Sequence, residues 1–390
     1  MSDSRTEPIS IQAAARTVSR IASIVVAALL ACALGLIGIL RLFSPGRPKP
    51  FDDETGHPLP GSISEKIHVD INGVQQGMFI RGKDVNNPVL LFVHGGPGMP
   101  TYFLTDRYPT DLEEYFTVCW WEQRGAGLSY REDLPRETLT VEQLVADTLE
   151  VTQYLRQRFG KEKIYLMGHS WGSYIGIQAA ARAPALYYAY IGVAQVTHQL
   201  ESEKLAYDYM LERFKASGNR KMVRKLEAAP LTLPDALPRA YDLLRDEAMH
   251  TLGIGTTHDM KSVITGIFLP SWFSRVYTLT EKANLWRGKF ASKSILWHKF
   301  IGTDLTQLVT ELDLPVYFFH GRYDYTVSYR LAQDYLEKLT APSKGFYTFE
   351  QSAHMPIFEE PARTRTILEN DVLFGVTLLG DDTEVLSPTP

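Results

Sequence analysis

The order of the predicted elements indicates an α/β fold with a mostly parallel central sheet and helices on both faces. Continuous apolar runs such as VLLFV (89–93) are typical of strands that are buried on both faces. Segments with apolar residues at helical spacing alternate with these runs, as in sheets built from strand–helix units. The alternation stops over residues 199–300, where few strand signals occur, and then resumes. We therefore expect one α/β domain that carries an inserted helical segment.

The core begins with a hairpin and continues with alternating strands and helices. Residues 67–82 alternate apolar and polar side chains around Asn72-Gly73, which predicts an antiparallel hairpin at one edge of the sheet. Apolar runs predict further strands at 115–121, 164–168 and 188–194, and helical spacing predicts helices at 141–159, ending at Gly160, and at 172–182. After the inserted segment we expect a strand at 314–321, a helix near 328–340, a strand at 345–350 and a last helix near 356–373.

These elements divide the chain into successive parts. The expected division is an N-terminal flank (1–20), a membrane anchor (21–43), a linker (44–63), a first core part (64–198), a helical cap (199–300), a second core part (301–375) and a flexible tail (376–390).

Residues 21–40, IASIVVAALLACALGLIGIL, carry no charge and are long enough to span a bilayer core of ~30 Å. A cleaved signal peptide would have a shorter apolar core, and a lipoprotein signal ending at Cys32 would turn polar after the cysteine. A buried helix of a soluble protein would be amphipathic. We therefore expect an uncleaved single-pass anchor. The basic residues on the two flanks of this segment nearly balance, so the side of the membrane on which the following domain lies stays open. The extracytoplasmic side is slightly preferred. The proline-rich segment 44–63 predicts an extended spacer.

The composition excludes several classes of function. The chain of 390 residues is 45% apolar and 22% charged, with a formal charge of −5, so it lacks the basic excess of a nucleic-acid-binding surface. Its two cysteines, Cys32 and Cys119, lie in different predicted elements and indicate no disulfide framework. No CxxC or HExxH motif occurs. We expect no metal, no cofactor and no nucleic-acid partner.

The predicted strand at 164–168 leads into Gly168-His169-Ser170-Trp171-Gly172, and a predicted helix follows at once. A G-x-S-x-G turn between a strand and a helix is so tight that only glycines fit around the serine, whose hydroxyl then projects above the sheet. The setting therefore predicts that Ser170 is a nucleophile. A serine hydroxyl needs a base, which is itself oriented by an acid.

The order serine, acid, histidine along the chain identifies the two partners. Asp324 follows the predicted strand at 314–321, and His354 follows the strand at 345–350, so both lie in loops at the same sheet edge as Ser170. Of the ten histidines, only His354 fits both order and setting. His320 lies before the acid and His169 beside the serine, and packing is the simpler role for each.

The predicted strand at 89–93 ends in His94-Gly95-Gly96-Pro97-Gly98, whose three glycines give the loop unusual backbone freedom. No Lys-Ser/Thr pair follows them and the spacing is not G-x-G-x-x-G, which argues against a phosphate-binding loop. A tetrahedral oxyanion needs two backbone N–H donors near the serine. We expect one donor from Trp171 and the other from Gly95 or Gly96.

Three stretches together, HGGPG (94–98), EQRGAGLS (122–129) and GHSWG (168–172), resemble the proline iminopeptidase family of α/β-hydrolases over about residues 65–375. That family usually has Asp where this chain has Glu122, in a stretch that is mostly architectural. The resemblance implies the α/β-hydrolase fold, the triad of Ser170, Asp324 and His354, and a helical cap over the pocket. It further implies acidic cap residues that hold the free amine of the substrate, for which the candidates are Glu201 and Glu203, although a solvated helix charge is the simpler role for each. Trp272 is a candidate for lining the pocket.

The expected activity is that of a serine hydrolase that acts through an acyl-enzyme. The resemblance favours an aminopeptidase of proline iminopeptidase type that acts on short peptides or amino-acid amides. A carboxylesterase or lipase would use the same triad, and a non-catalytic binding protein on this fold is a third alternative. The sequence separates the first two poorly because the cap decides the substrate, and it leaves the oligomeric state open.

Overall fold

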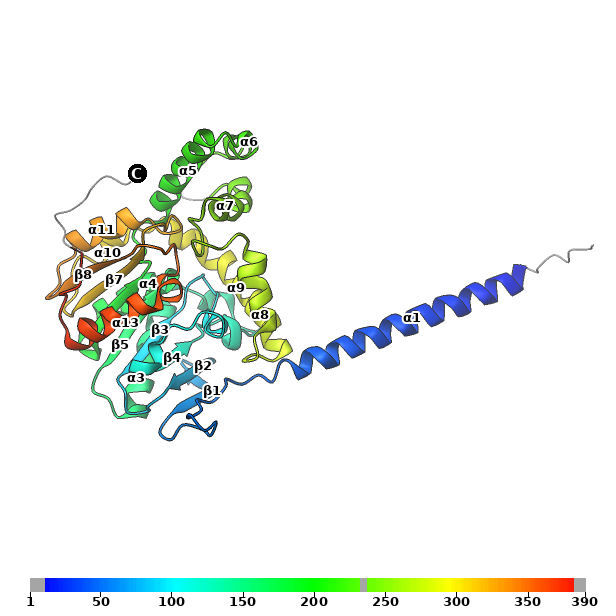
Figure 1. Ribbon diagram of the computed structural model, residues 1–390, viewed down its shortest axis with the longest axis horizontal. Coiled ribbons are helices and arrows are strands. Elements are labelled where there is room, and N and C mark those ends of the chain that lie inside the picture. Colours follow the sequence, from blue (N-terminus) through cyan, green and yellow to red (C-terminus); the bar gives the residue numbers. More distant parts are fainter. Residues whose placement is uncertain (1–10, 232–236, 382–390) are drawn as a thin grey trace, which may run out of the picture.

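The computed structural model describes residues 11–231 and 237–381, and Figure 1 shows a sheet-and-helix body from which one long helix projects. The sheet has eight strands in the order β1-β2-β4-β3-β5-β6-β7-β8. Their bounds are β1 Ile63–Ile71, β2 Val74–Gly82, β3 Val89–Val93, β4 Thr117–Trp121, β5 Ile164–His169, β6 Tyr187–Val193, β7 Val316–Gly321 and β8 Lys344–Phe349.

The sheet is parallel from β4 to β8 and antiparallel at the β1–β2 edge. The edge hairpin turns at Asn72 and Gly73, whose φ angles of 48° and 76° are the pair that a two-residue hairpin turn with left-handed residues requires. The expected fold class is thereby confirmed. Because the other strands are parallel, their carboxyl ends lie at one edge of the sheet, where sites of such folds gather.

Both faces of the sheet are buried, as the apolar runs predict. In β3, Val89, Leu91 and Val93 belong to one core cluster, which also takes in apolar side chains of α3, α4 and α11. Leu90 and Phe92 belong to a second cluster with residues of α13. Successive side chains of a strand point to opposite faces, so helices cover both sides of the sheet.

The helices keep their predicted order. α3 begins after Thr140, whose side chain accepts a hydrogen bond from the N–H of Gln143, and ends at Gly160 with φ 60°. The longer helices are α1 Ile11–Leu42, α3 Val141–Phe159, α4 Trp171–Arg182, α5 Gln199–Ala216, α6 Arg220–Glu227, α7 Arg239–Leu252, α9 Leu279–Ile301, α11 Tyr329–Lys338 and α13 Pro361–Asn370. The shorter ones are α2 Leu112–Tyr115, α8 Leu269–Phe273, α10 Leu305–Leu308 and α12 Pro356–Glu359, with a π-helical turn, η5, at Ile264–Phe268.

Helices α5 to α9 lie between β6 and β7 in the chain and form a cap at one side of the sheet (Figure 1). The cap is tied to the core through Glu122, the residue that departs from the family's usual aspartate. Its buried carboxylate accepts hydrogen bonds from the hydroxyl of Tyr277, just before α9, and from the N–H of Leu128. Burial raises the pKa of Glu122 to about 8.

The C-terminal region differs from the prediction of one helix near 356–373. The structure breaks this segment into α12, α13 and a short 3₁₀ turn at Val372–Phe374. The break falls at Glu360, which precedes Pro361 and has φ −128°, because a proline disfavours the helical conformation in the residue before it. Of the expected tail, residues 376–381 pack on the body, since Asp381 accepts a hydrogen bond from the N–H of Thr348. Residues 382–390 lie outside the described residues.

The N-terminal helix α1 begins at Ile11, earlier than expected. Its segment Arg16–Leu42 is long and apolar enough to cross a membrane, and none of it is buried against the body. The beginning of the expected spacer differs from the prediction, because it packs against the cap. Lys282 donates to the hydroxyl of Ser44 at 2.8 Å, and the N–H of Gly46 donates to the carbonyl of Arg275. A proline-rich segment forms few backbone hydrogen bonds within itself, and it therefore tends to be extended. An extended segment can still pack against a neighbouring surface, as this one does against the cap.

Candidate active site

Ser170 lies at the tight turn between β5 and α4, at the carboxyl edge of the sheet. Its φ and ψ of 54° and −123° are strained for a non-glycine residue, as in the serine turn that the motif predicts. A Cβ on Gly172 would lie 1.9 Å from the carbonyl oxygen of Val93, and one on Gly168 would lie 2.5 Å from the carbonyl oxygen of Gly172. The two glycines are therefore required by the close approach of the backbone.

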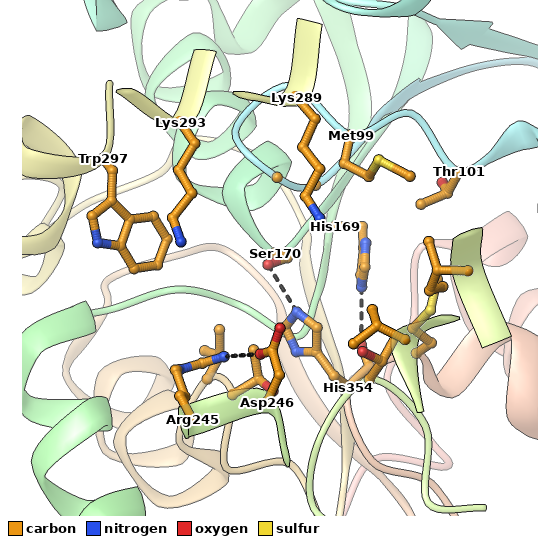
Figure 2. Close-up of a pocket in the computed structure, with 18 of the residues that line it drawn as sticks. Met99, Thr101, His169, Ser170, Arg245, Asp246, Lys289, Lys293, Trp297 and His354 are labelled. Atoms are coloured by element: carbon orange, nitrogen blue, oxygen red, sulfur yellow. Dashed lines mark hydrogen bonds and ion pairs between the residues drawn. The ribbon is translucent and has the colours of Figure 1, made fainter. Parts of the chain in front are cut away.

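The structure brings Ser170, His354 and Asp324 into one chain of hydrogen bonds. The His354 Nε2 lies 2.8 Å from the Ser170 Oγ, as Figure 2 shows. The Nδ1 of the same ring lies 2.8 Å from the Asp324 Oδ2. All three side chains are buried or nearly so. The other oxygen of Asp324 accepts the N–H of Val327 at 2.9 Å, which fixes the orientation of the carboxylate. The arrangement has the geometry that nucleophilic catalysis by a serine requires.

Asp324 stays ionised although it is fully buried. Burial alone would raise its pKa, but the neighbouring imidazoles of His354 and His320 outweigh this effect and hold the pKa of Asp324 below its usual range. The His320 Nε2 lies 3.3 Å from the Asp324 Oδ2 and 3.1 Å from the carbonyl oxygen of Val327. His320 is thus more than a packed group, since it makes a second contact with the acid.

His169, next to the serine, holds the backbone of His354. Burial lowers the pKa of His169 to about 3, so the ring is neutral. Its Nε2 lies 2.9 Å from the carbonyl oxygen of His354, a contact that requires the proton on Nε2. The Nδ1 is then an acceptor, and among the described residues this buried atom has no hydrogen-bond partner.

The glycine loop after β3 lies against the serine. Gly95 and Gly96 both line the cavity that contains Ser170. A Cβ on Gly95 would lie 3.3 Å from the Ser170 Cβ and 3.2 Å from the His169 Nδ1, so the loop backbone approaches the nucleophile closely. Trp171 is the first residue of α4, and its N–H therefore has no acceptor within the helix.

Gln123 connects the glycine loop to the serine turn, a role that sequence reasoning missed. Its side chain donates to the carbonyl of His94 at 2.7 Å and accepts from the indole N–H of Trp171 at 3.0 Å. Burial lowers the pKa of His94 to about 4, and the Nε2 of that neutral ring accepts the N–H of Gln123. The sequence does contain a signal for this role, namely Gln123 within the EQRG stretch (122–125), but the resemblance identifies that stretch only as mostly architectural.

The three cap residues expected to bind substrate do not line this cavity. Glu203 is buried in an ion pair with Arg245 at 2.7 Å, and it also accepts from Tyr241 and Gln199. Glu201 pairs with Lys204 at 3.2 Å, and its side chain is 42% exposed. Trp272 lies partly buried beside Phe268. The spacing of acids on one helix could not show which carboxylate another helix would neutralise.

Two other cap helices supply charged residues to the cavity. Asp242 and Asp246 lie four residues apart on α7, and Lys289 and Lys293 lie four residues apart on α9, so each pair shares one helix face. Figure 2 shows both lysines extended from α9 into the cavity that holds Ser170. These repeated i, i+4 charges were visible in the sequence, but they resemble the solvated face of any surface helix.

The cavity has a volume of about 230 Å³, and Trp297 and Phe300 of α9 are part of its lining. Its remaining apolar lining comes from residues such as Val263 and Ile267 of the segment around η5. Over residues 11–231 and 237–381, no group of three or more histidine, cysteine or acidic side chains is arranged to hold a metal ion.

Comparison with known proteins supports the resemblance seen in the motifs. A family model described as the alpha/beta hydrolase fold matches residues 88–361. A Bacillus subtilis protein named "Probable aminopeptidase YbaC" is 33% identical over 303 residues, which cover 77% of this chain and 94% of that protein. A proline iminopeptidase from Heyndrickxia coagulans is 25% identical over 278 residues, which cover 70% of this chain and 86% of the relative.

Among solved structures, the proline iminopeptidase of Mycobacterium smegmatis superposes with a TM-score of 0.58 and 17% identity, over 79% of this chain and 97% of that one. At this identity the likeness shows the fold alone. The resemblance to proline iminopeptidases is nevertheless confirmed at the level of sequence by the relatives above. Because the family model and the Bacillus subtilis relative both span most of the chain, this protein belongs to the α/β hydrolase fold family.

Proposed function

We propose that the protein is a serine aminopeptidase that removes the N-terminal residue of short peptides through an acyl-enzyme on Ser170. The observation that carries the proposal is the unbroken chain of hydrogen bonds from Asp324 through His354 to Ser170, which ends in a cavity. The named relatives favour a peptide substrate over an ester.

In the first half of the reaction, the Ser170 Oγ attacks the scissile carbonyl carbon and its proton passes to the His354 Nε2. Asp324 holds the proton on the His354 Nδ1 and stabilises the imidazolium that forms. The oxyanion accepts hydrogen bonds from the N–H of Trp171 and from the glycine loop, at Gly95 or Gly96. A donor of this kind lowers the barrier by about 3–4 kcal/mol.

In the second half, His354 gives its proton to the nitrogen of the leaving amine, and the shortened peptide departs. A water molecule then attacks the acyl-enzyme while His354 again takes a proton, and Ser170 is regenerated. Overall, the C–N bond of the amide and one O–H bond of water break, the hydroxyl of the water joins the carbonyl carbon and its proton replaces the one given to the leaving amine, so no electron transfer is needed.

Two features of the cavity support a small substrate with a free amine. Its volume of about 230 Å³ lies below the ~300–1,000 Å³ of sites for drug-sized ligands, which favours di- and tripeptides. Asp242 has both oxygens bound by Lys293, whereas Asp246 makes a single contact, 3.2 Å to Arg245, and its side chain is 55% exposed. We therefore propose Asp246, in place of Glu201 or Glu203, as the acid that binds the α-ammonium group.

We also propose that α1 anchors the protein in a membrane. None of the most apolar window of its segment Arg16–Leu42 is buried, and the mean hydropathy of that window is 2.7. The contact of Ser44 with Lys282 would then hold the cap near the membrane surface, since only Phe43 separates Ser44 from the last residue of α1.

The test is a substrate panel with the full-length protein in detergent. Amino-acid arylamides with a free α-amine, the same arylamides with the amine acetylated, and simple aryl esters are compared at equal concentration. The proposal predicts turnover of the free-amine arylamides, loss of turnover on acetylation, and no activity in Ser170→Ala. Turnover of the aryl esters alone would show a carboxylesterase with the same triad and would overturn the aminopeptidase proposal.

A further inference from the structure

We propose that Lys289 is a binding residue for a carboxylate group of the substrate, so that the site is specific for short peptides that carry a negative charge beyond the scissile bond. The inference rests on the proposed function and names the class of peptide that this site takes. It follows from the charges in the cavity, taken one at a time.

Lys289 lies on α9, and its side chain is part of the wall of the cavity that contains Ser170. Gly95, from the loop after β3, and Met355, next to His354, belong to the same wall, so the lysine shares one cavity with the serine. Figure 2 shows Lys289 and Lys293 side by side on α9, both pointing into that space.

The neighbouring cations already have acidic partners. Lys293 is bound by both oxygens of Asp242, at 2.8 and 2.9 Å. Arg245 is bound by both oxygens of Glu203 through its Nε, at 2.9 and 2.7 Å, and by Asp246 through its Nη1. Asp242 and Glu203 are thus engaged through both oxygens, whereas Asp246 makes one contact only.

Lys289 is the exception. Over the described ranges, no carboxylate lies within ion-pair distance of it and its ammonium group makes no hydrogen bond. Its nearest specific contacts are aromatic, since the Nζ lies 4.9 Å from the ring centre of Trp286 and 5.9 Å from that of Phe290. Partial burial lowers the pKa of Lys289. A desolvated and unpaired ammonium is unfavourable, and an anion in the cavity would relieve that cost.

The two charges are the ones that a peptide with both ends free needs, and both line the cavity that contains Ser170. In such a substrate the α-ammonium lies on one side of the scissile carbonyl and the carboxylate of the leaving residue lies on the other. Asp246 offers a carboxylate with one contact, and Lys289 offers an unpaired ammonium, in the same cavity as Ser170. Each would form a charge-assisted hydrogen bond with the opposite end of the substrate.

Two sources of the carboxylate fit this chemistry: the C-terminal carboxylate of a di- or tripeptide, and the side chain of an acidic residue after the scissile bond. Three peptides separate them. Ala-Ala carries a C-terminal carboxylate, Ala-Ala-amide carries none, and Ala-Glu-amide carries one on a side chain only.

The experiment measures binding without turnover. In full-length protein in detergent with Ser170→Ala, the dissociation constant of each peptide is measured by titration calorimetry, with Lys289 intact and with Lys289→Met. Methionine keeps an apolar chain against Trp286 and Phe290 but removes the charge. We expect Lys289→Met to weaken Ala-Ala by about 10–100-fold, the range for one hydrogen bond to a charged group, and to leave Ala-Ala-amide unchanged.

Matched variants separate the charge from general damage. Lys299→Met removes a lysine from the exposed end of the same helix and should leave all three dissociation constants unchanged. Lys289→Arg keeps the charge and should retain most of the preference for Ala-Ala over its amide. If Ala-Glu-amide behaves like Ala-Ala, the acidic side chain is also a source of the carboxylate.

The inference is overturned if the intact lysine gives Ala-Ala and Ala-Ala-amide equal affinity, if neither peptide binds, or if Lys289→Met weakens both to the same degree. The last result would assign Lys289 to packing against the aromatic rings. Failure of the proposed function has a different signature. In that case the protein with Ser170 intact hydrolyses none of the peptides, whatever the calorimetry shows.

Discussion

Replacing Asp324 with asparagine tests the proposed triad with little change in shape. The carboxylate accepts hydrogen bonds from the His354 Nδ1 at 2.8 Å and from the N–H of Val327 at 2.9 Å, and the His320 Nε2 lies 3.3 Å from the Asp324 Oδ2. An asparagine oxygen can keep the Val327 contact. Its amide nitrogen then faces His354 in place of the acceptor, so the ring must present an unprotonated Nδ1.

The consequence falls on the other ring nitrogen. With Nδ1 unprotonated, the proton of a neutral His354 moves to Nε2, which lies 2.8 Å from the Ser170 Oγ and can no longer accept the serine's proton. Loss of the correct tautomer in the general serine triad lowers kcat by about 10⁴-fold, or on the order of 5 kcal/mol of barrier. We expect a decrease of that size here.

The assay compares kcat/KM of wild type and Asp324→Asn on the best arylamide of the panel, together with thermal unfolding of both proteins. A variant with a nearly unchanged melting temperature and a rate that is lower by about three to five orders of magnitude agrees with the proposal. If the folded variant loses less than about tenfold in kcat/KM, Asp324 does not orient the base and the proposed triad is refuted.

Three further predictions follow from the structure. Gly172→Ala should prevent the serine turn from forming, because the added Cβ would lie 1.9 Å from the carbonyl oxygen of Val93. Thermal unfolding followed by circular dichroism should show severe destabilisation. The control Gly302→Ala should fold normally, because Gly302 has open space around it. Burial raises the pKa of Glu359 to about 7, so above the usual carboxyl range this group binds more protons in the folded state than in the unfolded state. Its contribution should lower the stability by up to about 3 kcal/mol as the pH rises from 5 to 8. In urea titrations the fall should therefore be smaller in Glu359→Gln than in wild type, while the buried Glu122 contributes to the fall in both proteins; an equal slope in both would contradict the assignment. Deleting residues 1–43 should leave arylamide turnover intact. Deleting 1–49 also removes the hydroxyl of Ser44, one of the two hydrogen-bond partners of the buried Lys282, which keeps the carbonyl of Trp272, and should cost about 1–3 kcal/mol of unfolding free energy. Equal stability of the two truncations would show that the contact of Ser44 with Lys282 is unimportant.

The parts of the fold that were predictable from sequence are those set by local pattern. The hairpin follows from Asn72-Gly73, because that pair adopts the left-handed turn that joins two antiparallel strands. The positions of Ser170 and His354 follow from parallel topology, because a residue just after a parallel strand lies at the shared carboxyl edge. Their meeting in the structure agrees with the predicted triad, whose catalytic role remains a prediction.

The parts that were not predictable depend on which helices meet. Glu203 and Asp246 are both acids on cap helices, and only the arrangement of α5 against α7 shows that Arg245 binds both oxygens of the first while making a single contact with the second. Lys289 and Lys293 have the same spacing and composition, yet only Lys293 lies beside an acid that binds it with both oxygens. The docking of Ser44 on Lys282 likewise joins segments that are far apart in the chain.

The most direct test of the central claim is to trap the acyl-enzyme. The full-length protein is mixed with an activated amino-acid ester that has a free amine, quenched in acid within milliseconds to seconds, and digested for peptide mass spectrometry. The account predicts an aminoacyl adduct on the peptide that contains Ser170, and no adduct and no turnover in Ser170→Ala. Turnover by wild type without a covalent adduct, or turnover by Ser170→Ala, would contradict it.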